Sequence, residues 1–595
     1  MKLRYKILFM VVALIGLSSC KDFLDKVPDT RVYLVNLDQL QQLLVTGYMD
    51  SNYALVGELS SDNVIDNNSP SKMKGSEGVR YHLPFYSQSD EQVFAWQDVD
   101  LDITSSDSPS GVWNACYGAI AAANAVLERI AEFEETGLIE GEEITTAQRD
   151  RMNAIKGEAL MIRAYHHFIL TQIFCLPYAG EEASADKDHP GIPYITKSET
   201  TLDPKYDRGT LLETYQNIEK DLLEGLPLIT EDFYQSPKYH FNIASSNAFA
   251  ARFFLNKRDY EKVVKYATAA LKGNDPKTML NDGWWQEDFY YISDIGRYFT
   301  SVERPGNFQI FTSYSSWWRR FLGYRFTCNR DAKRATIQGP GPSWARCQYQ
   351  NQKTKEKFAM MPCFNGVCGS AGGQEYGAYY AGNCFEQFEY TDKISGIGYA
   401  HEIRAEFTVE EVLLMRAEAN IFLGNIDAAF EDLWLWNEEH LSPNEADRYN
   451  HEHLTKDQIV SFYGYYDDPD RKDPGYGIVM KFHIDEVCPP MSPDQRLTND
   501  KEPYLQCVQH FRRIQFVHMG NRWFDIKRYG FAIQHDMGIS STYKLEWNDQ
   551  RKAIQIPNEV IGAGLVGNPR PENKPTETAE DSYVVVSRNE NVRAI

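Results

Sequence analysis

Apolar residues recur every three to four positions along several stretches of the chain, which places them on one face of an α-helix. The strongest stretches are residues 112–133, 152–174 and 211–226. Each is long enough for several helical turns, and each needs a neighbouring element to cover its apolar face. The pattern therefore predicts a mainly α protein.

Two later stretches, residues 245–271 and 408–433, resemble each other. When the two stretches are aligned with an offset of 168 residues, three pairs of identical residues match: Ala251 with Ala419, Leu255 with Leu423, and Asp259 with Asp427. Each stretch is typical of two helices joined by a short turn, with small alanines that allow close helix approach. The pattern resembles a tetratricopeptide repeat whose units are dispersed along the chain. Such units must stack on neighbours, so we expect helix pairs that build a right-handed scaffold.

Between these units, residues 273–400 are rich in Gly, Cys and aromatic residues and show little helical period. A second irregular run spans residues 467–503. Long loops in a compact protein are either functional or disordered, and the aromatic content argues against disorder. We expect a loop-rich irregular lobe beside the helical scaffold.

The N-terminus carries three basic residues and then an apolar run over residues 7–17. This run is too short to span a bilayer as a helix and is typical of a signal peptide. It ends in Leu17-Ser18-Ser19-Cys20, which resembles a bacterial lipobox and implies cleavage before Cys20 and lipidation of its thiol. We expect a signal peptide over 1–19 and one mature domain over 20–595. An ordinary secretory signal with an incidental cysteine is the other interpretation.

Charge and composition narrow the possible functions. The 595 residues are 43% hydrophobic, as in a globular protein with a large core, and carry a net charge of −23. An acidic surface repels phosphate backbones, so nucleic-acid binding is not expected. The acidic Asp22 and Asp25 after Cys20 resemble the surface-export signals of Bacteroidetes lipoproteins.

Nine cysteines follow Cys20, an odd number that leaves at least one thiol free if all pairing is internal. Cys116 and Cys175 lie in apolar helical patterns and are expected to be small buried hydrophobes. Cys363 and Cys368 are close enough in sequence to form a disulfide loop. The spacing of the cysteines does not match a zinc site, so no metal or cofactor is expected.

Four segments, in chain order, resemble the SusD/RagB family of outer-membrane nutrient-binding lipoproteins. They are the start at 20–28 (CKDFLDKVP), the helix at 157–168 (GEALMIRAYHHF) with Leu176-Pro177, the helix at 414–419 (LMRAEA), and 522–530 (RWFDIKRYG) with 556–560 (IPNEV) and Asn568-Pro569. The matches run through nearly the whole chain. One departure is Phe516-Val517-His518-Met519-Gly520, where the family carries an acidic residue before the glycine. This departure is expected to affect packing.

The resemblance implies a SusD-like fold and a cell-surface lipoprotein that delivers a nutrient to a TonB-dependent, SusC-like outer-membrane transporter. The motif residues themselves are expected to be structural. Arg522 and Asp525 lie three apart on a predicted helix, where opposite charges can pair. Trp523, Phe524 and Tyr529 are expected to fill the core or an interface.

Aromatic residues gather between 284 and 326, where 15 of 43 residues are aromatic. Indole and phenol rings stack on the apolar faces of sugars, and polar neighbours bind the hydroxyls. The candidate ligand residues here are Trp284, Trp285, Tyr314, Trp317 and Trp318. The alternative is that the cluster forms core or a partner interface.

A second candidate group lies in the N-terminal loops, where Arg80 and Trp96 precede the helix that begins near residue 112. Polar neighbours favour exposure of Trp96 over Trp113, which lies on a helical face. The alternative is that Trp96 closes the edge of the scaffold.

Signals of catalysis are poor. No nucleophile elbow, zinc-binding His-Glu-x-x-His or phosphate-binding loop is present, and acidic pairs are uninformative among 84 acidic residues. Asp467, Asp468, Asp470 and Asp473 could hold calcium, although they lack the EF-hand register and a solvated turn is the other interpretation. We expect a glycan-binding protein and no enzyme. Peptide capture, an exported glycan-cleaving enzyme and a scaffold that binds only proteins are the alternatives.

Overall fold

The structure of the protein is a computed structural model. It describes residues 34–48, 52–70, 80, 86–101, 103–199, 204–280, 292–320, 325–329, 332, 340–343, 348–350, 357–359, 368–369, 378–379, 384–440, 453–469, 478–539 and 541–577.

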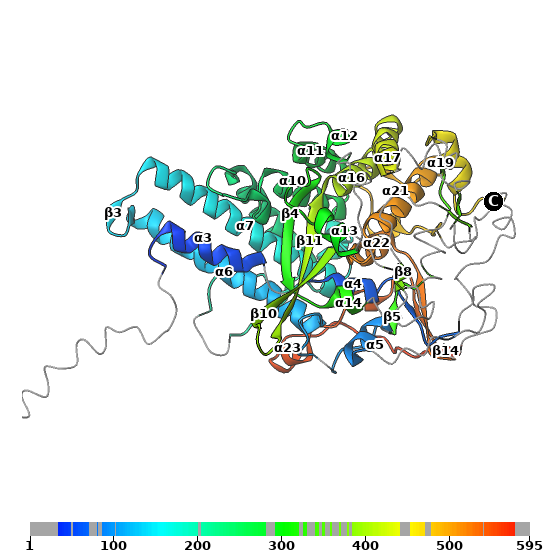
Figure 1. Ribbon diagram of the computed structural model, residues 1–595, viewed down its shortest axis with the longest axis horizontal. Helices are drawn as coiled ribbons and strands as arrows, with labels where there is room; N and C mark the ends of the chain where they lie inside the picture. Colours follow the sequence, from blue (N-terminus) through cyan, green and yellow to red (C-terminus); the bar gives the residue numbers. More distant parts are fainter. Residues whose placement is uncertain are drawn as a thin grey trace, which may run out of the picture.

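The predicted long helices are confirmed, and two of them form the longest feature of the fold. Helices α6 (Pro109–Thr136) and α7 (Thr146–Phe174) lie side by side, and α3 (Leu37–Val45) packs against both (Figure 1). A small hairpin of β2 (Leu138–Ile139) and β3 (Glu142–Glu143) joins α6 to α7. Local sequence sets their ends. The side chains of Ser108 and Thr145 accept hydrogen bonds from the first turns of α6 and α7, and Gly137 ends α6 in the left-handed conformation.

Two predicted helix pairs are also confirmed: α10 (Ile243–Asn256) with α11 (Tyr260–Ala270), and α16 (Val409–Phe422) with α17 (Ile426–His440). The pairs stack, because α11 packs on α16. The remaining helices of at least eight residues are α9 (Leu211–Gly225), α13 (Ile292–Phe299), α19 (Lys456–Tyr463), α21 (Glu502–Gln515) and α22 (Asn521–Tyr529). The shorter helices are α4 (Ala54–Leu59), α5 (Gln88–Phe94), α8 (Gly180–Ser184), α12 (Pro276–Leu280), α14 (Trp317–Arg320), α20 (Ile484–Val487) and α23 (Asn558–Gly562).

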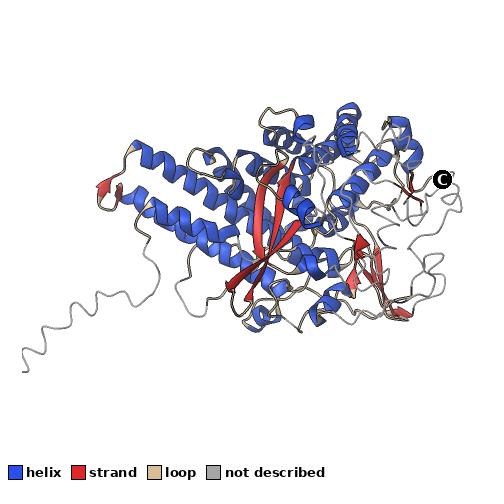
Figure 2. Ribbon diagram, in the orientation of Figure 1, coloured by secondary structure: helices blue, strands red, loops and turns tan. Residues whose placement is uncertain are grey.

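An antiparallel sheet lies at the centre of the molecule, between the long helices and α21 and α22 (Figure 2). Its strands are β4 (Asn307–Tyr314), β11 (Ile397–Thr408) and β10 (Cys384–Asp392), with β11 in the middle. The sequence pattern did not predict this sheet within residues 273–400.

Small sheets complete the fold. Their strands are β1 (Ile65–Asp66) with β5 (Phe326–Thr327), β2 (Leu138–Ile139) with β3 (Glu142–Glu143), β6 (Gln348–Gln350) with β7 (Lys357–Ala359), β8 (Cys368–Gly369) with β9 (Ala378–Tyr379), and β12 (Ile533–Met537) with β13 (Ser541–Leu545) and β14 (Thr576–Glu577).

Helix α16 separates two hydrophobic clusters. Leu413 belongs to the larger cluster, which reaches from α3 to the C-terminal segments, and Leu414 to a smaller one around Trp436 and Phe511. A helix that contacts core on both sides is apolar around most of its circumference. This explains why the LMRAEA motif is almost entirely buried.

Helix α22 begins where two backbones approach closely. Gly520 has a φ of +80°. A Cβ added to Gly57 of α4 would lie 2.6 Å from the carbonyl oxygen of Gly520. Both positions therefore require glycine. Met519 and Gly520 are buried here, and the departure at 516–520 does fall in tight packing.

Two cysteines, Cys116 and Cys175, were expected to be small buried hydrophobes, and the structure agrees. Cys116 and Cys175 are buried free thiols, as are Cys328, Cys488 and Cys507. Cys20 and Cys363 lie outside the described residues. No helix in the described ranges combines the length and hydrophobicity needed to cross a bilayer.

Candidate functional site

The candidate site lies where β4 ends and the chain turns into α14. Asp107 holds this turn, because its carboxylate accepts hydrogen bonds from the Ser315 hydroxyl and, at 3.1 Å, from the backbone N–H of Ser316. Trp317 then points inward and is fully buried in the large core cluster. Tyr314, one residue before the turn, points outward and is 38% exposed.

Helix α14 is tied to the neighbouring hairpin through charged groups. The Arg319 Nε lies 2.9 and 3.0 Å from the two carboxylate oxygens of Glu386 on β10. The backbone N–H of Trp318 donates to Glu402 on β11 at 3.1 Å, and the Trp318 ring is half-buried. The position of the hairpin relative to Tyr314 is therefore fixed from both strands.

Tyr314, Tyr399, His401 and Glu389 form one exposed surface, here called the tyrosine face. Tyr314 pairs with His401 across β4 and β11, and Tyr399 is two residues from His401, so the three side chains share one side of the sheet. The Tyr314 and Tyr399 ring centroids lie 5.9 Å apart at 78°, and Tyr399 is 59% exposed. The His401 Nε2 lies 2.7 Å from a Glu389 carboxylate oxygen.

The opposite side of the β10–β11 hairpin is aromatic too. The rings of Phe388 and Tyr390 lie 4.9 Å apart at 69°, and Tyr390 is 52% exposed. The turn of the hairpin ends in Ile394, which is almost entirely exposed. Exposed apolar groups gathered on one element mark contact with a ligand or a partner.

Two glutamates face each other across the hairpin. Glu386 and Glu402 are directly opposite in the register of β10 and β11, and Glu402 is fully buried. Burial, and then the nearby charge of Glu386, raise the pKa of Glu402 well above its usual value. A protonated Glu402 removes the repulsion that two opposed carboxylates would create.

The structure corrects the expectation that Trp96 is exposed. Its ring is only 4% exposed, its indole N–H donates to the Ser60 carbonyl at 3.0 Å, and it stacks on His535 at 4.3 Å. The neighbouring polar residues are accommodated by a turn, in which Trp96 itself has a φ of +52°. Trp96 therefore presents no ring to a ligand at the surface.

The other predicted ligand residues are placed as follows. Arg80 is partly buried, and the described residues show no contact between it and the tyrosine face. Trp284 and Trp285 lie outside the described residues. Of the predicted set, the structure places Tyr314 at the surface and Trp318 half-buried, whereas Trp317 is fully buried in the core and presents no ring to a ligand.

The sequence interpretation missed Tyr399 and His401, together with Phe388 and Tyr390. Tyr399, His401 and Ile403 alternate with other residues at a period of two, as on a strand. The turn residues Asp392–Gly396 before them complete a hairpin signal. This local alternation could have indicated the strands, but it was not recognised within the irregular lobe.

The candidate calcium ligands form no site in what is described. Asp467 and Asp468 are described, whereas Asp470 and Asp473 are not. Over the described parts of the chain, no group of three or more His, Cys, Asp or Glu side chains could hold a metal ion.

Comparison with known proteins shows which family and which fold this chain resembles. Residues 22–255 match the SusD-like family described as "Starch-binding associating with outer membrane". The fold matches a SusD superfamily protein of Bacteroides thetaiotaomicron over 90% of this chain and 100% of that chain, with a TM-score of 0.53 and 18% identity. The chain has a SusD-like fold.

Further solved structures agree with this SusD-like fold. A SusD superfamily protein of Bacteroides fragilis has a TM-score of 0.55 at 14% identity, covering 89% of this chain and 98% of that one. A SusD-like carbohydrate binding protein of Bacteroides vulgatus has a TM-score of 0.50 at 16% identity, covering 89% and 97%. These likenesses establish the fold. No curated protein matches the chain significantly.

Two of the sequence motifs meet in the core of the fold. Glu418 of the LMRAEA helix accepts hydrogen bonds from Arg528 Nη2 at 2.7 Å and from the Tyr529 hydroxyl at 2.6 Å. The expected pairing of Arg522 with Asp525 is not the ion pair that forms. Arg522 instead binds Asp62 in a bidentate arrangement at 2.8 and 2.9 Å.

Asp525 has different partners from the one predicted. It accepts hydrogen bonds from Arg528 one turn later and from Arg512 on α21. These two guanidinium groups lower the pKa of Asp525 although burial opposes them. Asp525 thus keeps a local i, i+3 pair on α22, but with Arg528 in place of Arg522, and adds a tertiary pair with Arg512.

Proposed function

We propose that this SusD-like protein captures a glycan at the outer membrane and passes it to a TonB-dependent transporter. The mature protein in this proposal is residues 20–595, released from the signal peptide 1–19 and held by a lipid on Cys20. It binds without cleaving its ligand. The family description, starch binding at the outer membrane, supports the class of ligand and the location.

The observation that carries the proposal is the tyrosine face. Tyr314 and Tyr399 present two phenol rings at an exposed sheet surface, with His401 and Glu389 beside them. Phenol rings stack on the apolar C–H face of a sugar, while imidazole and carboxylate groups bind its hydroxyls. The rings are held by strands rather than by loops, which lowers the entropy lost on binding.

Tyr314 and Tyr399 give the tyrosine face two neighbouring exposed rings. A chain of several sugar units can contact more than one ring at the same time. We therefore expect polysaccharides and longer oligosaccharides to bind better than single sugars at the tyrosine face, since each added contact contributes to affinity.

Binding of a panel of polysaccharides and oligosaccharides to the mature chain from Lys21 tests this proposal. Calorimetry would compare the wild type with Tyr314→Ala and Tyr399→Ala, since each variant removes one exposed ring. The matched control is Tyr239→Ala, because Tyr239 is 45% exposed, between the values for Tyr314 and Tyr399, and is not part of the tyrosine face. Each tyrosine-face variant should weaken binding to one glycan class by about tenfold, while the control does not.

Other outcomes would favour the alternatives. Binding of a peptide pool and of no glycan would support peptide capture on the same fold. Release of reducing ends from a polysaccharide would indicate an enzyme. Co-purification with the transporter, but no small-ligand binding, would support a scaffold that binds only proteins.

A further inference from the structure

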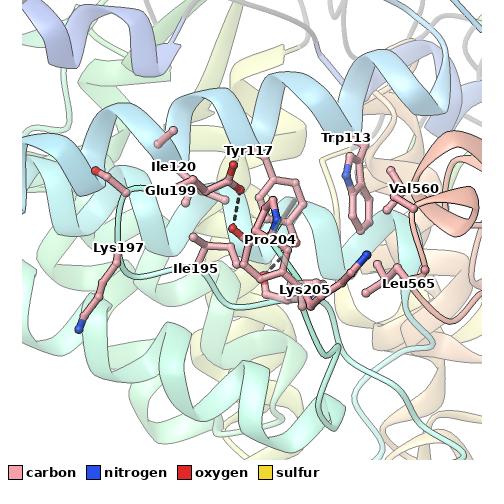
Figure 3. Close-up of a pocket in the computed structure, with 16 residues that line it drawn as sticks. Trp113, Tyr117, Ile120, Ile195, Lys197, Glu199, Pro204, Lys205, Val560 and Leu565 are labelled. Carbon is pink, nitrogen blue, oxygen red and sulfur yellow. Dashed lines mark hydrogen bonds between the residues drawn. The ribbon is translucent and has the colours of Figure 1, made fainter. Parts of the chain in front are cut away.

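A cavity of about 490 Å³ lies away from the hairpin, between α6, residues 193–199 and 204–206, and the C-terminal helix α23 (Figure 3). Its size falls within the ~300–1,000 Å³ typical of small-molecule sites. It is too small for a long polysaccharide segment but large enough for one or two sugar rings. None of its lining residues belongs to the tyrosine face.

The walls of the cavity are apolar and aromatic. Helix α6 contributes Trp113, Tyr117 and Ile120, which lie four and three residues apart and so share one side of the helix. Ile195 and Leu565 close the cavity from the other elements. Such a lining stacks on flat or ring-shaped ligands.

The indole of Trp113 lines the cavity, and its N–H is accessible from the cavity. Trp113 is only 5% exposed, yet its indole N–H donates to no acceptor among the described residues. Buried indole N–H groups usually find an acceptor. The Trp96 and Trp436 indoles do so here, through the Ser60 carbonyl and the Gln515 side chain, whereas the buried Trp523 indole does not. A ligand oxygen in the cavity would provide the acceptor that Trp113 lacks.

A second polar group lies at the open side of the cavity. The Tyr206 hydroxyl donates to one carboxylate oxygen of Glu199, and both residues line the cavity (Figure 3). Partial burial and this hydrogen bond raise the pKa of Tyr206 to about 12. The hydroxyl therefore stays a donor, and the other Glu199 oxygen can accept from a ligand hydroxyl.

We propose that this cavity is a second binding site and that it takes a mono- or disaccharide. The ligand would place its apolar ring face against the Trp113 and Ile195 walls, accept a hydrogen bond from the Trp113 indole, and donate one to Glu199. This combination of an apolar face, an acceptor and a donor is the chemistry of a pyranose. The site goes beyond the glycan capture proposed above, because it uses other elements and a shorter ligand.

Titration of the mature chain from Lys21 with glucose, galactose, xylose, maltose and cellobiose tests the second site. Phenol serves as a ring-shaped probe without the sugar hydroxyls. Trp113→Phe keeps a ring but removes the indole N–H, and Glu199→Gln removes the carboxylate at an exposed position. Each variant should weaken binding of the best saccharide by about tenfold. Tyr314→Ala should leave that binding unchanged.

Three results would overturn the second site. The first is that no saccharide binds in the millimolar range. The second is that saccharides bind equally well to the wild type, to Glu199→Gln and to folded Trp113→Phe. The third is that phenol binds but no saccharide does. These results are distinguishable from failure at the tyrosine face. Loss of polysaccharide binding in Tyr314→Ala reports on that face only, whereas short saccharides report on the cavity. Glu199→Gln keeps the test valid if Trp113→Phe does not fold.

Discussion

At the residue scale, Glu58 shows how burial sets the charge of a single group. Its carboxylate is fully buried on α4 and accepts hydrogen bonds from the Gly520 backbone N–H and the Asn63 side chain, both at 3.2 Å. Burial is the main cause that raises the pKa of Glu58 to about 7, against 4.5 for a glutamate side chain in water. The folded state therefore binds a proton that the unfolded state releases between these two values.

This shift predicts a pH dependence of stability. The contribution of Glu58 is fully present below pH 4.5 and is lost as the pH rises through 7. Between pH 5 and pH 8 the loss is about 2 kcal/mol. Glu58→Gln removes the titration, so its free energy of unfolding in urea should fall less than that of the wild type over this range. An equal fall in both proteins would show that Glu58 is not protonated in the fold.

Residue-scale exposure was the least predictable property. Trp96 has polar neighbours and Trp113 lies on a helical face, yet both rings are buried. The two indoles differ in their surroundings. The Trp96 N–H donates to the Ser60 carbonyl, whereas Trp113 lines a cavity. Sequence neighbours cannot reveal this, because Ser60 is 36 residues away from Trp96.

At the element scale, the helices were predictable and the central sheet was not. Helices such as α7 carry a long apolar period and a clear N-cap at Thr145, so local sequence determines them. Strands β4 and β11 lie more than 80 residues apart in sequence, and their pairing depends on contacts that no local window contains. The hairpin turn alone was a local signal.

The ion pair between Arg319 and Glu386 holds α14 against the hairpin and so positions Tyr314 beside Tyr399. Because the Arg319 side chain is 41% exposed, its removal should hardly change stability. Arg319→Ala should still weaken glycan binding by about threefold, since the hairpin loses one anchor. Lys393→Ala, which removes a charge at the hairpin turn, is the matched control.

Calorimetric titration of both variants, with thermal unfolding beside it, checks this prediction. Equal affinity in Arg319→Ala and Lys393→Ala would mean that the ion pair does not orient the binding surface. A large drop in melting temperature for Arg319→Ala would assign the pair to stability instead.

At the scale of the whole molecule, buried ion pairs connect motifs that lie far apart in the sequence. Glu418 and Arg528 are 110 residues apart and join the LMRAEA helix to α22. Arg522 joins α22 to Asp62, which follows α4 near the start of the described chain. These pairs explain why charged residues occur within the family-like motifs without forming a ligand site.

Removing one partner of such a pair should be costly. Glu418→Ala leaves Arg528 buried beside Asp525 alone and should lower the free energy of unfolding by about 3 kcal/mol. Asp38→Asn, which breaks the largely exposed pair with Arg151, should change it by less than about 1 kcal/mol. Urea unfolding measures both. Equal small effects would show that the Glu418–Arg528 pair does not hold the two parts together.

The candidate site was partly predictable at this scale. The aromatic segment 284–326 indicated Tyr314, Trp317 and Trp318, and the fold brings these to one turn. Tyr399 and His401 enter from β11 through strand pairing, so composition along the chain could not group them with Tyr314. The cavity beside Trp113 likewise forms from three distant segments.

Glycan capture on the tyrosine face is tested most directly by native electrophoresis through gels that contain a polysaccharide which the wild type binds. The double variant Tyr314→Ala/Tyr399→Ala should migrate as freely as it does without polysaccharide, while the wild type and Tyr239→Ala are retarded. Equal retardation of the double variant and the wild type would contradict glycan capture at this face.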